Sequence, residues 1–242
     1  MLPKAVSPFW NTSITTHGSR LTNFLLDTVA FPNYTGGIGF GEKYIRKLLG
    51  QCGKLDIDDC IESVRFLIKQ GMSEPGKQYL LSGSHGGFII AHRMSSACLI
   101  SRSINLPLSV IGQFPDDFRA AAIRNPVINL GETSTTDIPD WYFEEIGVGW
   151  KPDSIMTPDV YKDAFAMSPI VYVDRVRTPL QVHLGLKDQR VSLDQGRKYY
   201  HVLKAKGKDV EMFCFKDDGH GIESLEGARV AYYATKTLFE RV

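Results

Sequence analysis

Short apolar runs alternate with segments of helical periodicity through most of this chain, and this alternation restricts the folds open to it. Strands are predicted at residues 78–81, 118–123, 180–184 and 210–215. Helices are predicted at residues 57–68, from Phe88 onward, at 192–204 and at 223–239. Because strands that alternate with helices pair in parallel, the sequence predicts an α/β protein with a mostly parallel sheet and helices on both faces.

Several local signals accompany these elements. The helix at 57–68 has acidic residues in its first turn and Gly71 beyond its end. Ser192 and Gln195 have the spacing of a capping box, which predicts that their side chains close the amino end of a helix. The run 78–81 is predicted to be a short buried strand, and residues 25–31 are a further strand candidate before an Asn- and Gly-rich loop.

Length and composition are those of one soluble globular domain, with 242 residues of which 43% are apolar. The net charge of +1 gives no reason to expect nucleic acid or an anionic membrane surface as a partner. No apolar run reaches the roughly 18 residues of a membrane span, and residues 1–6 lack the apolar region of a signal peptide. We therefore expect a cytoplasmic protein whose four scattered cysteines are reduced: Cys52, Cys60, Cys98 and Cys214.

The run Ser82-Gly83-Ser84-His85-Gly86-Gly87 lies between a predicted strand and a predicted helix. A serine in a sharp strand-to-helix turn with small neighbours is typical of the nucleophile elbow of α/β-hydrolases, because the turn lifts the hydroxyl clear of the sheet. The helix that follows points free N–H groups at the site, so the backbone N–H of His85 is the expected donor to an oxyanion. A Gly/Ser turn without chemistry is the alternative interpretation of this run.

Two further residues complete a set of nucleophile, base and orienting acid in the order Ser, Asp, His that this fold uses. Asp188 follows the strand at 180–184, and His220 follows the strand at 210–215. Since the carboxyl ends of parallel strands meet at one edge of the sheet, both residues should share that edge with Ser84. The predicted catalytic residues are Ser84 as nucleophile, His220 as base and Asp188 as the group that orients the imidazole.

Other titratable residues fit this chemistry less well. Asp217 and Asp218 share the loop of His220 and are expected to be solvated. His183 lies inside an apolar strand and is expected to be a core residue, whereas His92 and His201 fall on predicted helices. No paired-histidine spacing predicts a metal site and no Gly-rich loop predicts a nucleotide, so neither a metal nor a cofactor is expected.

Several separated motifs resemble, in order, the catalytic domain of the acylaminoacyl-peptidases in the prolyl oligopeptidase family of serine peptidases. They are GSHGGF at 83–88, RNPVIN at 124–129, TDIPDW at 136–141, GLKDQRV at 185–191, and the shorter segments 33–36, 39–41, 168–170 and 178–180. The resemblance implies the α/β-hydrolase fold, the same three catalytic residues, no cofactor, and release of an N-acylated amino acid from short blocked peptides. It also implies a catalytic domain at 31–242 after a divergent remnant at 1–30, and it leaves a homo-oligomer open.

The chain also departs from that family. Family members usually carry a β-propeller and an HGGP-type loop that supplies a second oxyanion donor, whereas this chain has no room for a propeller and keeps only His17-Gly18-Ser19-Arg20. Ser82 replaces a usual glycine at a modest expected packing cost, and residues 93–110 look like an insertion. The fold is therefore expected to be N-terminally truncated, and a weak or inactive fragment and a general carboxylesterase stay open as alternatives. Ile138 and Trp141 either line a substrate pocket, by analogy with the family, or pack in the core.

Overall fold

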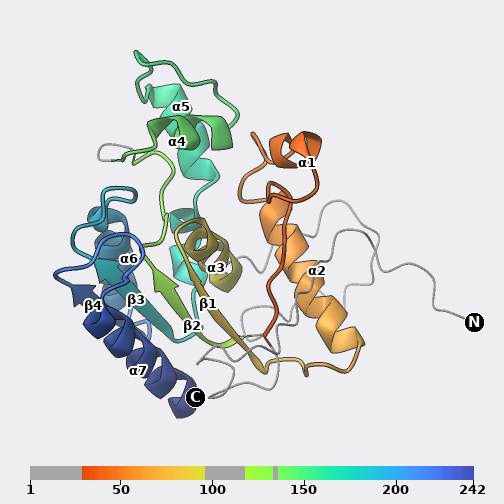
Figure 1. Ribbon diagram of the computed structural model, residues 1–242, viewed down its shortest axis with the longest axis vertical. Helices are drawn as coiled ribbons and strands as arrows, with labels where there is room; N and C mark the ends of the chain where they lie inside the picture. Colours follow the sequence, from red (N-terminus) through yellow and green to blue (C-terminus); the bar gives the residue numbers. More distant parts are fainter. Residues whose placement is uncertain (1–28, 96–117, 133–135) are drawn as a thin grey trace, which may run out of the picture.

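The structure is a computed structural model of the chain, and it describes residues 29–95, 118–132 and 136–242. Within those residues four parallel strands form one sheet, in the spatial order β1-β2-β3-β4 (Figure 1). The strands are β1 Gln78–Gly83, β2 Phe118–Arg124, β3 Leu180–Gly185 and β4 Val210–Phe215. The predicted parallel α/β architecture is confirmed, and the common strand direction brings the carboxyl ends to a single edge.

Helices cover both faces of this sheet (Figure 1). One face packs against α3 (His85–Ser95), α6 (Leu193–Ala205) and the 3₁₀ helix η3 (Pro169–Arg175), and the other packs against α7 (Leu225–Arg241). Ala121 and Ile123 of β2 belong to the core beneath α3 and α6. Ala120, one residue away, packs instead with Leu238 and Phe239 of α7. Side chains alternate between the two faces of a strand, and this alternation divides the core into two layers.

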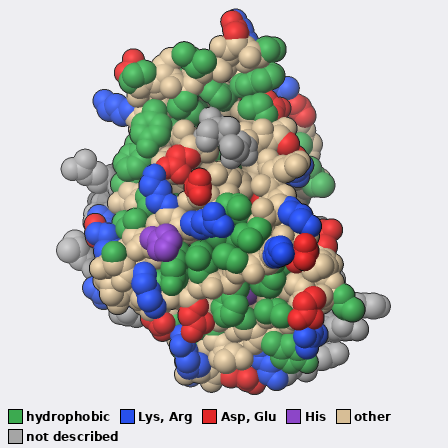
Figure 2. Space-filling view, turned by 90° about the vertical axis from the view of Figure 1, so that its left-hand side faces the viewer, with side chains coloured by type: hydrophobic (Ala, Val, Ile, Leu, Met, Phe, Trp, Pro, Cys, Tyr) green, Lys and Arg blue, Asp and Glu red, His purple; other side chains and the backbone are tan. Residues whose placement is uncertain are grey.

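The remaining helices lie outside these layers. Helix α2 (Leu55–Lys69) packs beside α3, after the short α1 (Glu42–Arg46). Helices α4 (Pro139–Glu145) and α5 (Pro158–Ala166) lie together at the end of the molecule toward which the chain runs when it leaves β2 (Figure 1). None of the helices in the described ranges is long and apolar enough to cross a membrane. Side chains of both charge signs are interspersed with hydrophobic ones over the face shown in Figure 2.

The predicted positions of the elements agree with the structure to within a few residues. Helix α3 begins at His85, three residues before the predicted start at Phe88. Helix α7 begins at Leu225 because the side chain of Ser224 accepts the N–H of Gly227 and so caps the helix. Residues 29–31 have no strand structure, and the rest of the strand candidate at 25–31 lies outside the described residues.

One local prediction is wrong, and a second is wrong in part. Every residue of β1 is half-buried rather than buried, because β1 is the edge strand of the described sheet and pairs on one side only. As predicted, the Ser192 hydroxyl caps α6, by accepting the N–H of Asp194 at 3.3 Å, but Gln195 does not complete the capping box. The buried Gln195 side chain instead accepts the N–H groups of Ile128 and Asn129 at 2.6 and 3.0 Å. These buried N–H groups need an acceptor, and the requirement outweighs the local capping pattern.

Candidate active site

Ser84 lies in the turn between β1 and α3, where the elbow pattern places it. Its φ of 55° is in the left-handed region, which a residue with a Cβ adopts only when its surroundings hold it there. The Ser84 N–H donates to the carbonyl of Arg124 at 2.8 Å, and the Val127 N–H donates to the carbonyl of Ser84 at 3.3 Å. A serine held at positive φ between a strand and a helix has the backbone geometry of a nucleophile elbow.

The glycines around Ser84 allow close packing that a side chain would prevent. A Cβ on Gly87 would lie 2.7 Å from Cβ of Pro126, and a Cβ on Gly83 would lie 3.1 Å from the carbonyl oxygen of Arg124. A Cβ on Gly86 would overlap the hydroxyl of Ser82. Ser82 is therefore accommodated in this elbow because Gly86 has no side chain.

Asp188 and His220 come together beyond the carboxyl ends of β3 and β4. Nδ1 of His220 lies 2.8 Å from Oδ2 of Asp188, and the Asp188 side chain is fully buried whereas 26% of the His220 side chain is exposed. The other carboxylate oxygen of Asp188 accepts the N–H groups of Arg190 and Val191 at 2.8 and 3.1 Å. Since Asp188 engages Nδ1, Nε2 is the ring nitrogen left to accept a proton.

Asn125 fixes the loops that carry these two residues, and sequence reasoning gave it no role. Its side chain is buried, and its Oδ1 accepts the N–H of Gly185 at 2.9 Å. Its Nδ2 donates to the carbonyls of Gly219 and His220 at 3.2 and 2.7 Å. Asn125 also has a positive φ of 41° directly after β2. An asparagine immediately beyond a strand end was the available signal, since asparagine tolerates this backbone region better than most residues.

The segment that begins with Asp137 is tied to the loop of Asp188. The Asp137 N–H donates to the carbonyl of Gln189 at 3.0 Å. Its carboxylate accepts two hydrogen bonds from the Arg190 guanidinium at 3.2 and 3.1 Å, which lower the pKa of Asp137. The backbone N–H of Arg190 also donates to the Asp188 carboxylate. The segment that leads into α4 and the carboxylate of Asp188 therefore belong to one hydrogen-bond network.

The two aspartates that precede His220 differ from each other. Asp217 is exposed and pairs with Lys187 at 3.0 Å, in agreement with the prediction that it is solvated. The same prediction for Asp218 is wrong, because Asp218 is buried and accepts the N–H and the hydroxyl of Ser224 at 2.7 and 2.8 Å. The chain folds back tightly before α7, and Asp218 closes that turn.

Three other histidines lie where the sequence placed them. His183 is a fully buried core residue of β3, and burial together with the charge of Arg124 lowers its pKa to about 3. His92 lies on α3 with Nε2 2.9 Å from the carbonyl oxygen of Met167. His201 lies on α6 and is exposed. None of these three side chains contacts the Asp188–His220 pair through a hydrogen bond found in the described part of the chain.

His85 is the first residue of α3, where backbone N–H groups have no acceptor within the helix. Its ring stacks on Phe88 with the centroids 5.2 Å apart and meets Trp141 edge-on at 5.5 Å. Its Nε2 lies 2.9 Å from Oδ2 of Asp56 on α2. Trp141 is therefore a neighbour of the elbow, whereas Ile138 is the residue before α4.

Two segments that bear on activity lie wholly or mostly outside the described residues. One is residues 17–20, the expected remnant of the second oxyanion loop. The other is the segment 93–110, of which residues 93–95 continue α3.

The fold and the backbone geometry of the elbow are those of an α/β-hydrolase. The sequence matches the model of the prolyl oligopeptidase family over residues 27–97 and 105–240, and the chain belongs to this family of serine peptidases. The unmatched residues 98–104 fall inside the segment that the sequence sets apart as an insertion.

Several curated relatives of this chain are acylamino-acid-releasing enzymes. The one from Arabidopsis thaliana is 36% identical over 193 residues, covering 79% of this chain and 23% of the relative. The one from Homo sapiens is 32% identical over 224 residues, covering 87% of this chain and 28% of the relative. The solved acylaminoacyl peptidase of Pyrococcus horikoshii has a TM-score of 0.70 at 25% identity over 88% of this chain and 32% of that one. The predicted family and fold are confirmed, and the chain spans about a quarter of the length of these curated relatives.

Proposed function

We propose that this chain is the catalytic domain of a serine peptidase that releases an N-acylated amino acid from short blocked peptides. The observation that supports it most is the 2.8 Å contact between His220 Nδ1 and Asp188 Oδ2, formed at the sheet edge where Ser84 follows β1 in a strained turn. Ser84, Asp188 and His220 follow three different strands. Their order in the chain and their position at a common edge are therefore two separate observations, and both support the proposal.

In the proposed reaction the Ser84 hydroxyl attacks the carbonyl carbon of the acylated residue, whose peptide bond to the next residue is then cleaved. Nε2 of His220 takes the hydroxyl proton and then gives it to the leaving amine, while Asp188 holds Nδ1–H and stabilises the imidazolium. The N–H of His85 donates to the oxyanion of the tetrahedral intermediate. Water, deprotonated by the same imidazole, then hydrolyses the acyl-enzyme and frees the N-acylated amino acid.

The substrate class rests on the relatives rather than on a pocket. Two of the relatives, both acylamino-acid-releasing enzymes, are 36% and 32% identical to this chain. Trp141 supports the proposal because its indole contacts the ring of His85, beside the elbow, from the first turn of α4. We assign it to the wall against which the acylated residue lies. An aromatic wall provides apolar contact area for the acyl and side-chain groups.

The test compares hydrolysis of an acetyl-amino-acid p-nitroanilide and of a p-nitrophenyl ester by the wild-type chain and by Ser84→Ala. The proposal predicts release of the acetylated amino acid that is lost in the variant, with circular dichroism unchanged. Equal rates near background for both proteins would assign the chain to an inactive fragment. Ser84-dependent hydrolysis of the ester without any hydrolysis of the anilide would assign it to the carboxylesterases.

A further inference from the structure

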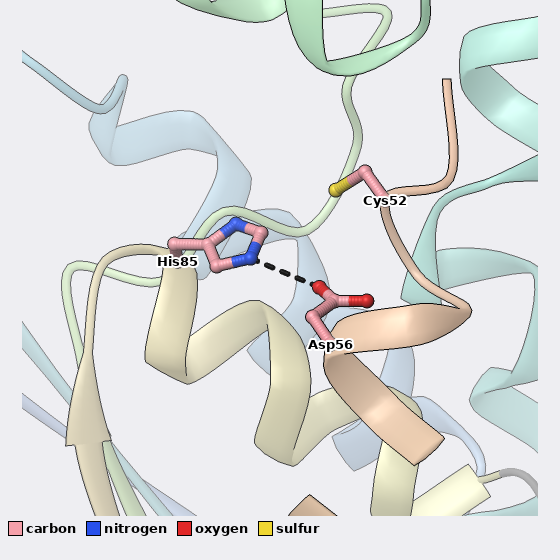
Figure 3. A group of neighbouring side chains, drawn as sticks. All are labelled: Cys52, Asp56 and His85. Carbon is pink, nitrogen blue, oxygen red and sulfur yellow. Dashed lines mark hydrogen bonds and ion pairs between the residues drawn. The ribbon is translucent and has the colours of Figure 1, made fainter. Parts of the chain in front are cut away.

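Cys52, Asp56 and His85 direct their side chains toward one another on the α2 side of the elbow (Figure 3). Cys52 lies in the turn before α2, Asp56 lies in the first turn of α2, and His85 begins α3. One ligand atom from each residue, a sulfur, a carboxylate oxygen and a ring nitrogen, lies within 4.8 Å of the other two. The group does not include Asp188 or His220, and the proposed hydrolysis does not use it.

Burial distinguishes this group from the surface clusters of acidic residues that proteins commonly carry. The Asp56 side chain is fully buried, Cys52 is 2% exposed, and 15% of the His85 side chain is exposed. Asp56 uses Oδ1 to accept the N–H of Ile57 at 3.0 Å, which fixes the carboxylate. Buried carboxylates are unfavourable unless a cation or hydrogen bonds compensate them.

A second buried carboxylate adjoins the group. Glu145, at the end of α4, is 9% exposed and is a neighbour of the Cys52 thiol. Its oxygen Oε2 has no hydrogen-bond partner in the described structure. Burial raises the pKa values of both Glu145 and Cys52. Three acidic side chains, those of Cys52, Asp56 and Glu145, therefore lie together beside a single imidazole.

The donor set is one that zinc prefers. A thiolate, an imidazole and a carboxylate are all common Zn²⁺ ligands, and a site with three protein ligands keeps a fourth position for water or another carboxylate. In the tetrahedral geometry that zinc adopts, ligand atoms about 2.0–2.3 Å from the metal lie roughly 3.4–3.6 Å apart. Here Nε2 and Oδ2 are 2.9 Å apart and all three ligand atoms lie within 4.8 Å of one another, so side-chain rotations must separate the first pair and bring the thiol closer. The sequence spacing, four residues and then 29, matches no metal motif, which is why motif analysis predicts no metal.

We propose that Cys52, Asp56 and His85 form a binding site for a divalent zinc-like ion, with Glu145 adjacent to it. The ion replaces the hydrogen bond between Nε2 of His85 and Oδ2 of Asp56, and it displaces the thiol proton of Cys52, which passes to solvent. The bound ion links the turn before α2, the first turn of α2 and the start of α3, and so ties the residue after Ser84 to a neighbouring helix.

The test titrates Co²⁺ into the metal-stripped full chain and follows the thiolate-to-cobalt charge-transfer absorption, which reports sulfur ligation without any need for catalysis. The wild-type chain should develop this band with one equivalent of Co²⁺ and lose it on addition of Zn²⁺. Cys52→Ser should weaken binding by at least about 100-fold, since even second-shell partners contribute about 10- to 100-fold. Cys214→Ser removes an exposed thiol and is the matched control, which should keep the wild-type band.

Asp56→Asn supplies an independent variant should Cys52→Ser fail to fold. It should leave the thiolate band but weaken binding, and the increase in Tm that Zn²⁺ gives the wild-type chain should shrink. A folded wild-type chain that shows no thiolate band, or a band that Cys214→Ser abolishes and Cys52→Ser does not, would overturn the proposal. The group would then be a hydrogen-bonded His–Asp pair beside an unligated thiol.

Discussion

Replacement of Asp188 by asparagine tests the proposed mechanism at the contact that supports it. The carboxylate of Asp188 accepts three hydrogen bonds, from the N–H groups of Arg190 and Val191 and from His220 Nδ1. The asparagine oxygen can keep the two backbone bonds, which leaves its NH₂ group facing Nδ1. An NH₂ group donates and cannot accept, so His220 must place its proton on Nε2, where a base needs a lone pair.

The expected loss of kcat/KM is about 10⁴-fold, the size of effect that a wrong tautomer causes in serine hydrolases, or about 5.5 kcal/mol of transition-state stabilisation. Stability should change by about 1 kcal/mol or less, because both backbone bonds survive in the variant. The assay is steady-state hydrolysis of an acetyl-amino-acid p-nitroanilide, with urea denaturation as the measure of stability.

Asp217→Asn is the matched control for Asp188→Asn. Asp217 is nearer to His220 in sequence, but its side chain is 76% exposed and pairs with the exposed Lys187. Exposed pairs of this kind contribute little, so the control should change kcat/KM by less than about twofold. The reasoning is refuted if Asp188→Asn keeps more than about a tenth of the wild-type kcat/KM, or if the control loses as much.

Three further predictions concern Gly86 in the elbow, the buried His92, and Asn125, which holds the loops of Asp188 and His220. Gly86→Ala should lower the free energy of unfolding by about 1–3 kcal/mol, because the new Cβ would overlap the Ser82 hydroxyl, and Ser82→Gly should restore most of it in urea melts. Burial lowers the pKa of His92 to about 4 from 6.5. As the pH falls, the His92 imidazole therefore becomes protonated in the unfolded chain before it does so in the folded chain, which favours unfolding. The wild-type chain should therefore lose about 3 kcal/mol of stability from this group between pH 6.5 and 4, and His92→Gln should flatten that part of the measured pH profile. Asn125→Ala should lower stability by about 3 kcal/mol and reduce kcat, because it leaves a buried N–H and two carbonyls without their partner, and an unchanged denaturation midpoint would contradict this role.

The elements and the proposed catalytic residues could be predicted because their signals are local. Ser84, Asp188 and His220 each follow an apolar strand, and parallel strands bring such positions to one edge whatever the rest of the chain does. The same logic identified the core histidine His183 from the apolar residues on either side of it.

The roles that sequence reasoning missed depend on contacts between distant segments. Asn125 reaches a carbonyl 95 residues away, and Gln195 reaches N–H groups 66 and 67 residues away. Asp218 looked solvated because its partner, Ser224, faces it only after the chain folds back. Cys52 and His85 have no motif spacing and meet only through the packing of α2 on α3. Residue types and spacings do not specify such tertiary partners.

Reaction of the wild-type chain with a fluorophosphonate tests the proposed nucleophile most directly, because this reagent labels only a serine that is activated for attack. The account predicts a single adduct that peptide mass spectrometry assigns to Ser84, and no adduct on the folded variant Ser84→Ala. A wild-type chain that is folded by circular dichroism and remains unlabelled, or an adduct on a serine other than Ser84, would contradict it.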